Sequence, residues 1–215
     1  MRREKIVQSI IDAGVIAIIR MIDTSSLMDV LEALVDGGIR CIEITLTVPG
    51  AYEIISTLAA NSSLEILVGG GTVLDAKSAR RAIDAGAQYL VSPTAWMGMI
   101  KLCRKSSVVS IPGAFTPTEI YNVWRSGADI VKVFPANAGG PQYITDVMRP
   151  FPELRLLPTS GITVENAAEY IKAGACAVWI GAALTDPELV KRGEFLTLRK
   201  MSRQLLRNIK RARSK

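Results

Sequence analysis

Short apolar segments alternate with helical segments along the whole chain, and this alternation restricts the possible folds more than any other feature. Eight segments rich in Val, Ile and Leu are predicted to be strands: 15–20, 41–46, 66–70, 89–92, 108–111, 130–134, 154–158 and 177–181. Their near-continuous apolar content indicates strands buried on both faces, as in a parallel sheet covered by helices.

The segments between these strands carry clear signals for where helices begin and end. Thr116-Pro-Thr-Glu119 has the pattern of a capping box with proline at the first helical position, and Asp75 is a predicted N-cap. Glycine recurs just before predicted strands, at Gly38, Gly86, Gly127 and Gly174. The spacing of roughly 40–50 residues between them is about two βα units.

These elements predict a (β/α)8 barrel, with an extra N-terminal helix at 2–13 and a basic C-terminal helix at 191–213. A doubly wound open sheet is the alternative. Nothing in the sequence marks a linker, so residues 1–215 are expected to form one domain. The run Gly69-Gly-Gly71 lacks the spacing of a dinucleotide-binding loop.

Composition excludes several kinds of chemistry and location. The chain has no histidine, which removes His-based nucleophile pairs, general acid–base catalysis and the usual zinc sites. No apolar run reaches the roughly 18 residues that span a bilayer. Glu4, Gln8 and Asp12 interrupt any signal-peptide core. The three cysteines form no CxxC pair, so we expect a cytoplasmic protein.

The positive charge of the protein is concentrated in its last 25 residues. Residues 191–215 carry ten Lys or Arg and one Glu, whereas residues 1–190 carry 16 basic and 19 acidic side chains. Leu198, Met201, Leu205 and Ile209 follow helical spacing, so we expect this helix to pack on the barrel with its arginines outward. Contact with nucleic acid is the less favoured reading.

One predicted strand, Ile130-Val-Lys-Val-Phe134, contains a lysine in its middle. Burying an ammonium group is costly, so Lys132 is either paired with a carboxylate or kept partly neutral for chemistry. The segment alone favours the paired cation. A neutral lysine amine is a nucleophile that forms Schiff bases with ketones.

Active sites of (β/α)8 barrels lie at the C-terminal ends of the strands. Polar or small residues occur there at Arg20, Glu43, Thr45, Thr47, Thr72, Thr94, Lys132, Ser160, Gly161, Gly181 and Ala182. A cation, a carboxylate and a lysine are what a class I aldolase needs to bind a 2-keto acid, condense with it and move protons. For Glu43, a catalytic role and an ion pair with Arg20 or Lys132 stay equally open.

Seven segments in order carry a resemblance to a known family: 15–20, 42–46, 70–74, 91–93, 111–117, 131–135 and 140–144. Over about residues 5–190 the chain resembles the 2-keto-3-deoxy-6-phosphogluconate and 4-hydroxy-2-oxoglutarate aldolases. The resemblance implies a homotrimeric (β/α)8 barrel that cleaves its keto acid to pyruvate and an aldehyde, without metal or cofactor. It assigns the Schiff base to Lys132 and acid–base work to Glu43.

The resemblance also implies binding roles. Thr72 would bind the pyruvate carboxylate, Pro93 and Phe134 would form pocket walls, and Ser160 and Gly161 would bind phosphate. Two positions depart from the family pattern. Thr47 stands where many members have an arginine, with Arg20 as the candidate replacement, and Ala182 stands where many have a serine.

Two other classes of function remain. One is a phosphosugar-metabolising barrel enzyme without a Schiff base, and the other is a non-catalytic barrel that binds a metabolite or nucleic acid. Lys132 and Glu43, in a chain without histidine, favour the aldolase.

Overall fold

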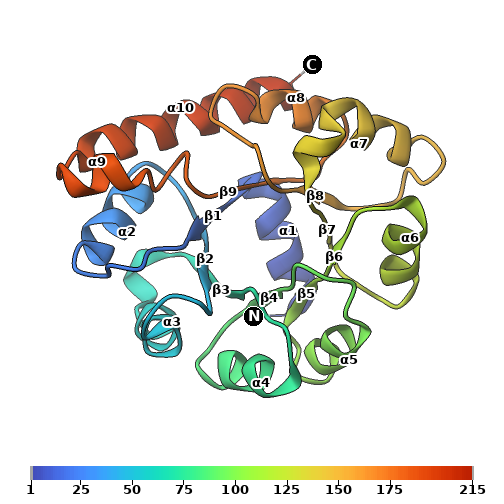
Figure 1. Ribbon diagram of the computed structural model, residues 1–215, viewed down its shortest axis with the longest axis horizontal. Coiled ribbons are helices and arrows are strands. Elements are labelled where there is room, and N and C mark those ends of the chain that lie inside the picture. The colour runs from blue at the N-terminus through green and yellow to red at the C-terminus, as the bar shows by residue number, and fades with distance from the viewer. Residues whose placement is uncertain (1, 215) are drawn as a thin grey trace.

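The computed structural model describes residues 2–214, and Figure 1 looks down a ring of strands surrounded by helices. The strands are β1 (Val15–Ile19), β2 (Cys41–Thr45), β3 (Leu67–Gly71), β4 (Tyr89–Val91), β5 (Val109–Ile111), β6 (Gly113–Ala114), β7 (Val131–Val133), β8 (Leu156–Pro158) and β9 (Val178–Ile180). All eight predicted strands are present, with ends shifted by one or two residues.

All strand pairs are parallel, and they close into a barrel. One run has the order β5-β4-β3-β2-β1-β9 and the other β6-β7-β8. The predicted strand 108–111 covers β5 only. β6 continues beyond it and is separated from β5 at Pro112, because proline has no N–H to donate. Thr159 bridges to Trp179 between β8 and β9, and Ile130 N donates to Ser110 O between β7 and β5. The barrel is therefore closed, and the open-sheet alternative is wrong.

Helices occupy the connections between the strands. They are α1 (Arg3–Ala13), α2 (Leu27–Asp36), α3 (Ala51–Ala60), α4 (Ala76–Asp84), α5 (Met97–Lys105), α6 (Pro117–Arg125), α7 (Gly140–Met148), α8 (Ala167–Lys172), α9 (Pro187–Lys191) and α10 (Phe195–Arg213), with short 3-10 turns at Ser62–Leu64 and Ala136–Ala138. The capping box at Thr116 and the Asp75 cap are confirmed. Gly38, Gly86, Gly127 and Gly174 all have positive φ, as expected for residues that end helices.

The basic C-terminal helix is shorter than expected. It begins at Phe195 rather than at residue 191, because Gly193 adopts a left-handed conformation and separates it from α9. Leu198, Leu205 and Ile209 are buried as expected, while Met201 is only half-buried. The helix packs along α2 and α8 at the edge of the molecule (Figure 1).

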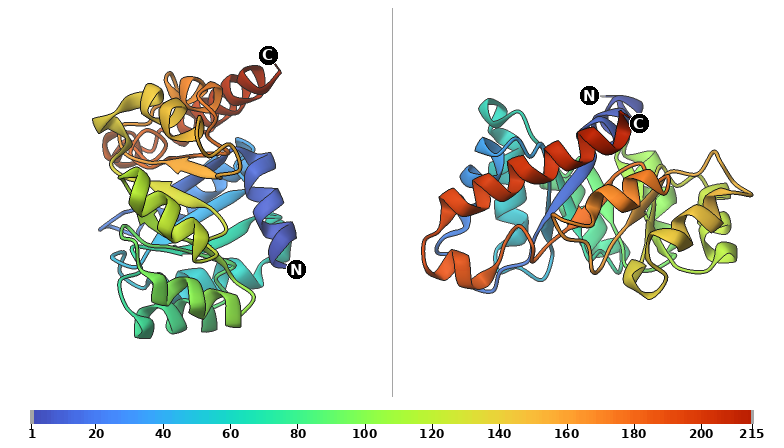
Figure 2. Two further views of the ribbon diagram at one scale, coloured as in Figure 1. Left: turned by 90° about the vertical axis from the view of Figure 1, so that its right-hand side faces the viewer. Right: turned by 90° about the horizontal axis from the view of Figure 1, so that it is seen from above.

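The apolar core has two parts. Helices pack on the outside of the strands in the larger part, while a smaller cluster fills the barrel interior. Ile6, Val7 and Ile10 of α1 join this interior cluster, so α1 covers the N-terminal end of the barrel (Figure 2).

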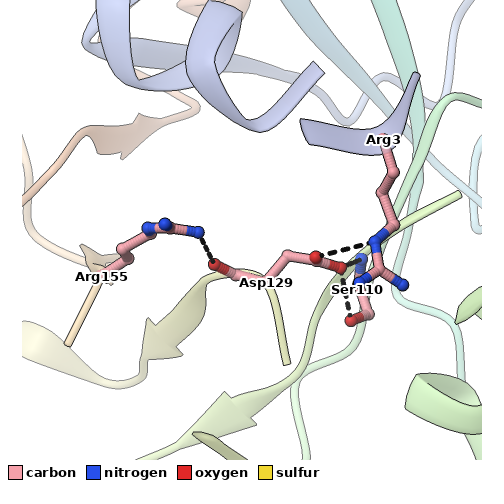
Figure 3. A network of polar contacts seen from close by, with 4 residues as sticks. All are labelled: Arg3, Ser110, Asp129 and Arg155. Carbon is pink, nitrogen blue, oxygen red and sulfur yellow. Dashed lines mark hydrogen bonds and ion pairs between the residues drawn. The ribbon is translucent and has the colours of Figure 1, made fainter. Parts of the chain in front are cut away.

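A polar network ties α1 to the barrel strands (Figure 3). The Arg3 guanidinium lies 3.1 Å from the buried Asp129 carboxylate, which also accepts hydrogen bonds from the backbone and hydroxyl of Ser110. Arg155 approaches the Asp129 carbonyl oxygen. Asp129 is therefore contacted by Arg3 of α1, by Ser110 of β5 and by Arg155 just before β8. These contacts fix α1 over this end of the barrel. No helix within residues 2–214 is long and apolar enough to cross a membrane.

Candidate active site

A cavity of about 520 Å³ opens at the C-terminal ends of the strands. It contains most of the residues that the sequence singled out. Its lining is Ile18, Arg20, Thr72, Pro93, Lys132, Phe134, Thr159, Ser160, Gly161, Ile162, Thr163, Trp179, Gly181, Ala182, Ala183, Thr185 and Pro187.

Lys132 lies in the floor of this cavity, on the central residue of β7. Its side chain is 3% exposed, and its Nζ lies 3.5 Å from the centre of the Trp179 ring and 4.9 Å from that of Phe134. Among residues 2–214, no carboxylate forms an ion pair with it. Burial lowers the pKa of Lys132 to about 8, and Arg20 lowers it further while Glu43 opposes the shift. The ion-pair reading of Lys132 is therefore wrong.

Glu43 lies behind the cavity wall, on the interior face of β2. It is fully buried, and neither carboxyl oxygen has a hydrogen-bond partner among the described residues. Burial raises the pKa of Glu43 to about 8, against the opposing effects of Lys132, Arg20 and the Trp179 indole. A carboxyl group and an amine with pKa values this close to neutral can exchange protons with a substrate at physiological pH.

The glycine run of β3 makes room for this carboxyl group. A Cβ atom on Gly71 would lie 1.5 Å from Glu43 Oε1, so no other residue fits there without moving the glutamate. The space beside Gly69 is likewise filled by the ring of Tyr89, whose Cε2 would lie 2.1 Å from a Cβ atom at that position. The sequence shows the run at 69–71 and predicts a strand and a family-like segment there, but it does not indicate that two of these glycines make room for other side chains.

Two lining residues have a backbone conformation that side chains rarely adopt. Thr72 has φ of 58° and Ser160 has φ of 83°, both in the left-handed region. For the β-branched Thr72 this conformation is costly, and such strain concentrates at functional sites. Thr72 directly follows Gly71, so the strained turn also ends the strand that accommodates Glu43.

The loop after β8 is fixed in place by asparagines. Asn166 donates to the Gly161 carbonyl and accepts from the backbone of Thr163, each at 2.8 Å. A Cβ on Gly161 would meet Asn137 at 2.7 Å. At the end of β9, a Cβ on Gly181 would meet only Ile18, at 3.4 Å, so space alone does not require that glycine.

Thr45, Thr94 and Thr47 are singled-out threonines that do not line the cavity. Thr94 is exposed and hydrogen-bonds with the Ser92 hydroxyl. Thr47 is likewise outside the cavity lining. It is exposed and hydrogen-bonds to the Thr45 hydroxyl, which in turn donates to the Ile19 carbonyl. Trp179 and Thr159 were missed, although both belong to the interior face of their strands. A period of two, counted back from Gly161 and Gly181, identifies Thr159 and Trp179. Within residues 2–214, no group of three or more His, Cys, Asp or Glu side chains is placed to hold a metal ion.

Comparison with known proteins identifies the class of enzyme. A family model described as KDPG and KHG aldolase matches residues 6–201. The 2-dehydro-3-deoxy-phosphogluconate aldolase of Treponema pallidum is 32% identical, over 89% of this chain and 91% of its own. The KHG/KDPG aldolase of Escherichia coli K12 is 29% identical, over 94% of this chain and 96% of its own.

The solved structures agree with this match. A KDPG aldolase from Legionella pneumophila, captured with pyruvate as a covalent carbinolamine intermediate, has a TM-score of 0.84 at 27% identity and covers 93% of this chain and 97% of its own. Fold, site and relatives thus define a class I aldolase, a carbon–carbon lyase that acts on a small keto acid. More particularly, the chain belongs to the KDPG and KHG aldolase family.

Proposed function

We propose that this enzyme cleaves 2-keto-3-deoxy-6-phospho sugar acids, 4-hydroxy-2-oxoglutarate or both to pyruvate and an aldehyde, with Lys132 forming the Schiff base. The observation that carries the proposal is Lys132 itself. Its amine is buried at the cavity floor, has no carboxylate partner among residues 2–214, and has a pKa lowered to about 8. The relatives named for KDPG and KHG support this choice of substrates.

The chemistry follows from these groups. The neutral Lys132 amine adds to the C2 carbonyl, and loss of water gives an iminium ion. In cleavage, a base takes the proton of the C4 hydroxyl, the C3–C4 bond breaks, and its electron pair moves into C2=C3 while the iminium nitrogen becomes neutral. Protonation of C3 and hydrolysis then release pyruvate. Glu43 is both the base and the acid in this proposal, because its charge and that of Lys132 each affect the pKa of the other group.

The remaining singled-out residues have binding roles in this proposal. Arg20 supplies positive charge to the keto-acid carboxylate, with Thr72 beside it. Pro93 and Phe134 form the apolar walls around the reacting carbons. Ser160, Gly161, Gly181 and Ala182 surround the far end, where backbone N–H groups and the hydroxyls of Thr163 and Thr185 suit a phosphate or carboxylate. Thr47 acts only at a distance, through its hydrogen bond to Thr45.

Borohydride reduction in the presence of pyruvate tests the Schiff base. We expect one covalent adduct located at Lys132 by mass spectrometry, and none in Lys132→Ala. Because the neutral amine is the nucleophile, the rate of trapping is expected to rise with pH through about 8 and to level off above it. An adduct on a different lysine, or none at all, contradicts the proposal. A screen of phosphorylated and unphosphorylated 2-keto-4-hydroxy acids for pyruvate release then identifies the substrate.

We also propose that residues 1–215 form a single domain that assembles as a homotrimer in the cytoplasm. Three unpaired cysteines support a reducing compartment. Exposed apolar side chains follow the ends of three strands, at Ile22, Leu74 and Phe134, which supports an interface between subunits. A designed cage made by fusing symmetric oligomeric domains has a TM-score of 0.84 with this chain, at 26% identity, and covers 94% of this chain and 73% of its own.

A further inference from the structure

Unpaired polar groups gather in one part of the barrel interior. Among residues 2–214, six buried side-chain polar atoms lack a hydrogen-bond partner, and five of them belong to Glu43, Tyr89, Thr159 and Trp179. Buried polar groups in folded proteins are almost always satisfied, by protein or by ordered water. Since these five atoms come from interior positions of four strands, their concentration needs a common explanation.

Tyr89 belongs to this group, and the proposed mechanism gives it no role. The phenol is fully buried, and burial raises its pKa well above the ordinary value, with further contributions from Cys41 and Glu43. It is therefore neutral and able to donate a hydrogen bond throughout the working pH range. Leaving such a hydroxyl unsatisfied costs free energy, whereas phenylalanine would fill the same space without that cost.

The strand register directs Tyr89 towards Glu43. Glu43 pairs with Gly69, and Gly69 pairs with Tyr89, so the three residues form one row across β2, β3 and β4. Gly69 has no side chain, and the Tyr89 ring occupies its place. A Cβ there would lie 2.5 Å from Cζ, the ring carbon that carries the hydroxyl. The ring thus crosses β3 towards β2, which carries Glu43 and Cys41.

We propose that Tyr89 is a positioning residue for Glu43: its hydroxyl and the carboxyl group share a buried water molecule that orients the carboxylate for proton transfer. The inference rests on the proposed function of Glu43. In that step the carboxylate takes a proton from C3 of the pyruvate iminium, the C3–H electron pair becomes the C2=C3 bond, and the C=N pair moves to nitrogen. A water held by Tyr89 donates to the carboxylate and so stabilises its ionised form.

The ionisable groups that face this pair are few. Lys132 and Arg20 influence Glu43 from β7 and from the end of β1, and Cys41 lies two residues before it on β2. The pKa of the Cys41 thiol is raised to about 12 by burial, so it stays neutral. The side chains of α1 below them, Ile6, Val7 and Ile10, are apolar.

Tyr89→Phe isolates the hydroxyl, because it keeps the ring over Gly69. The readout is exchange of the pyruvate C3 protons with deuterium as a function of pH, with borohydride trapping measured in parallel. We expect unchanged trapping but an exchange profile moved upward by about one pH unit, which makes exchange up to about tenfold slower on the acidic limb. Above that limb the two rates should converge. Tyr121→Phe removes the same atom from α6, outside the barrel, and should leave the profile unchanged.

Three results would overturn the inference. If the exchange profile of Tyr89→Phe coincides with that of the wild type and the variant is more stable, the Tyr89 hydroxyl has no hydrogen-bond partner, not even water. Slower exchange by an equal factor at every pH would indicate a packing role only. Unchanged exchange in Glu43→Gln, with trapping at Lys132 intact, would remove the role of Glu43 and this inference with it. Loss of trapping at Lys132 in the wild type would instead reject the proposed function.

Discussion

At the scale of single residues, the site consists of a lysine and a glutamate that both have unusual protonation. The sequence pointed to Lys132 and Glu43, because a chain without histidine has few residues suited to acid–base chemistry. Their actual state could not be predicted from the sequence. Whether Lys132 pairs with Glu43 depends on a separation set by barrel closure. The strand segment alone favours a paired cation, whereas the sequence as a whole favours a catalytic lysine.

The protonation of Glu43 predicts how stability responds to pH. The carboxyl group ionises near 4.5 in the unfolded chain but only near 8 in the folded protein. Between these values the folded state holds a proton that the unfolded state has lost, so this group's contribution to stability falls as pH rises. Glu43→Gln has no such proton. We therefore expect the unfolding free energy of Glu43→Gln to increase relative to that of the wild type as the pH rises from 4.5 to 8.

Urea unfolding at several pH values measures this difference. The variant and the wild type should differ least near pH 4.5 and most near pH 8. Parallel pH dependences would contradict the raised pKa. Glu65→Gln, the same change at an exposed position, serves as the matched control.

At the scale of elements, strand β3 shows how backbone and chemistry are coupled. Its sequence predicted a strand but gave no reason for three consecutive glycines. The reason is tertiary: the inward-facing Gly69 and Gly71 are filled by side chains from the neighbouring strands β4 and β2. Such contacts cross between strands that are far apart in sequence, so local patterns do not reveal them. The same applies to Trp179, which reaches Lys132 from another strand.

Alanine substitutions along β3 separate packing from catalysis. In Gly71→Ala the new methyl group overlaps the Glu43 carboxylate, and displacing a catalytic group by about 1 Å can cost on the order of 100-fold in rate. Gly70 faces the helices, where a Cβ would meet Ala82 at 3.1 Å and Leu90 at 3.3 Å. Gly70→Ala is the matched control.

Overpacking is expected to cost each variant about 1–3 kcal/mol of stability. Only Gly71→Ala should also lose C3 proton exchange per folded molecule, with trapping at Lys132 retained. Urea titration and deuterium exchange measure the two effects separately. Equal exchange in the two variants would mean that the position of the carboxyl group does not matter.

At the scale of the whole molecule, the alternation of strands and helices was enough to predict the barrel and its eight strands. It did not predict where α10 begins, because the basic pattern of residues 191–213 continues across Gly193, whose left-handed backbone ends the preceding helix. It also gave no direct information on assembly, because an interface depends on which apolar side chains remain uncovered after folding. Ile22, at 92% exposed, is such a residue.

A homotrimer predicts a particle of three times 23.2 kDa in solution. Light scattering coupled to gel filtration measures this mass directly. If Leu74 and Ile22 lie in the interface, Leu74→Asp combined with Ile22→Asp should reduce the mass to that of the monomer. A monomeric wild type would contradict the trimer while leaving the aldolase chemistry untouched.

If Lys132 forms the Schiff base as we propose, the helix that closes the N-terminal end of the barrel also sets the order of events during turnover. With α1 sealing that end, substrate and both products share one opening, and the carbons bonded to Lys132 lie deepest. The aldehyde is formed nearer the opening and must depart before pyruvate can pass. In the synthetic direction pyruvate must enter first, so the architecture imposes a last-in, first-out sequence on the two half-substrates.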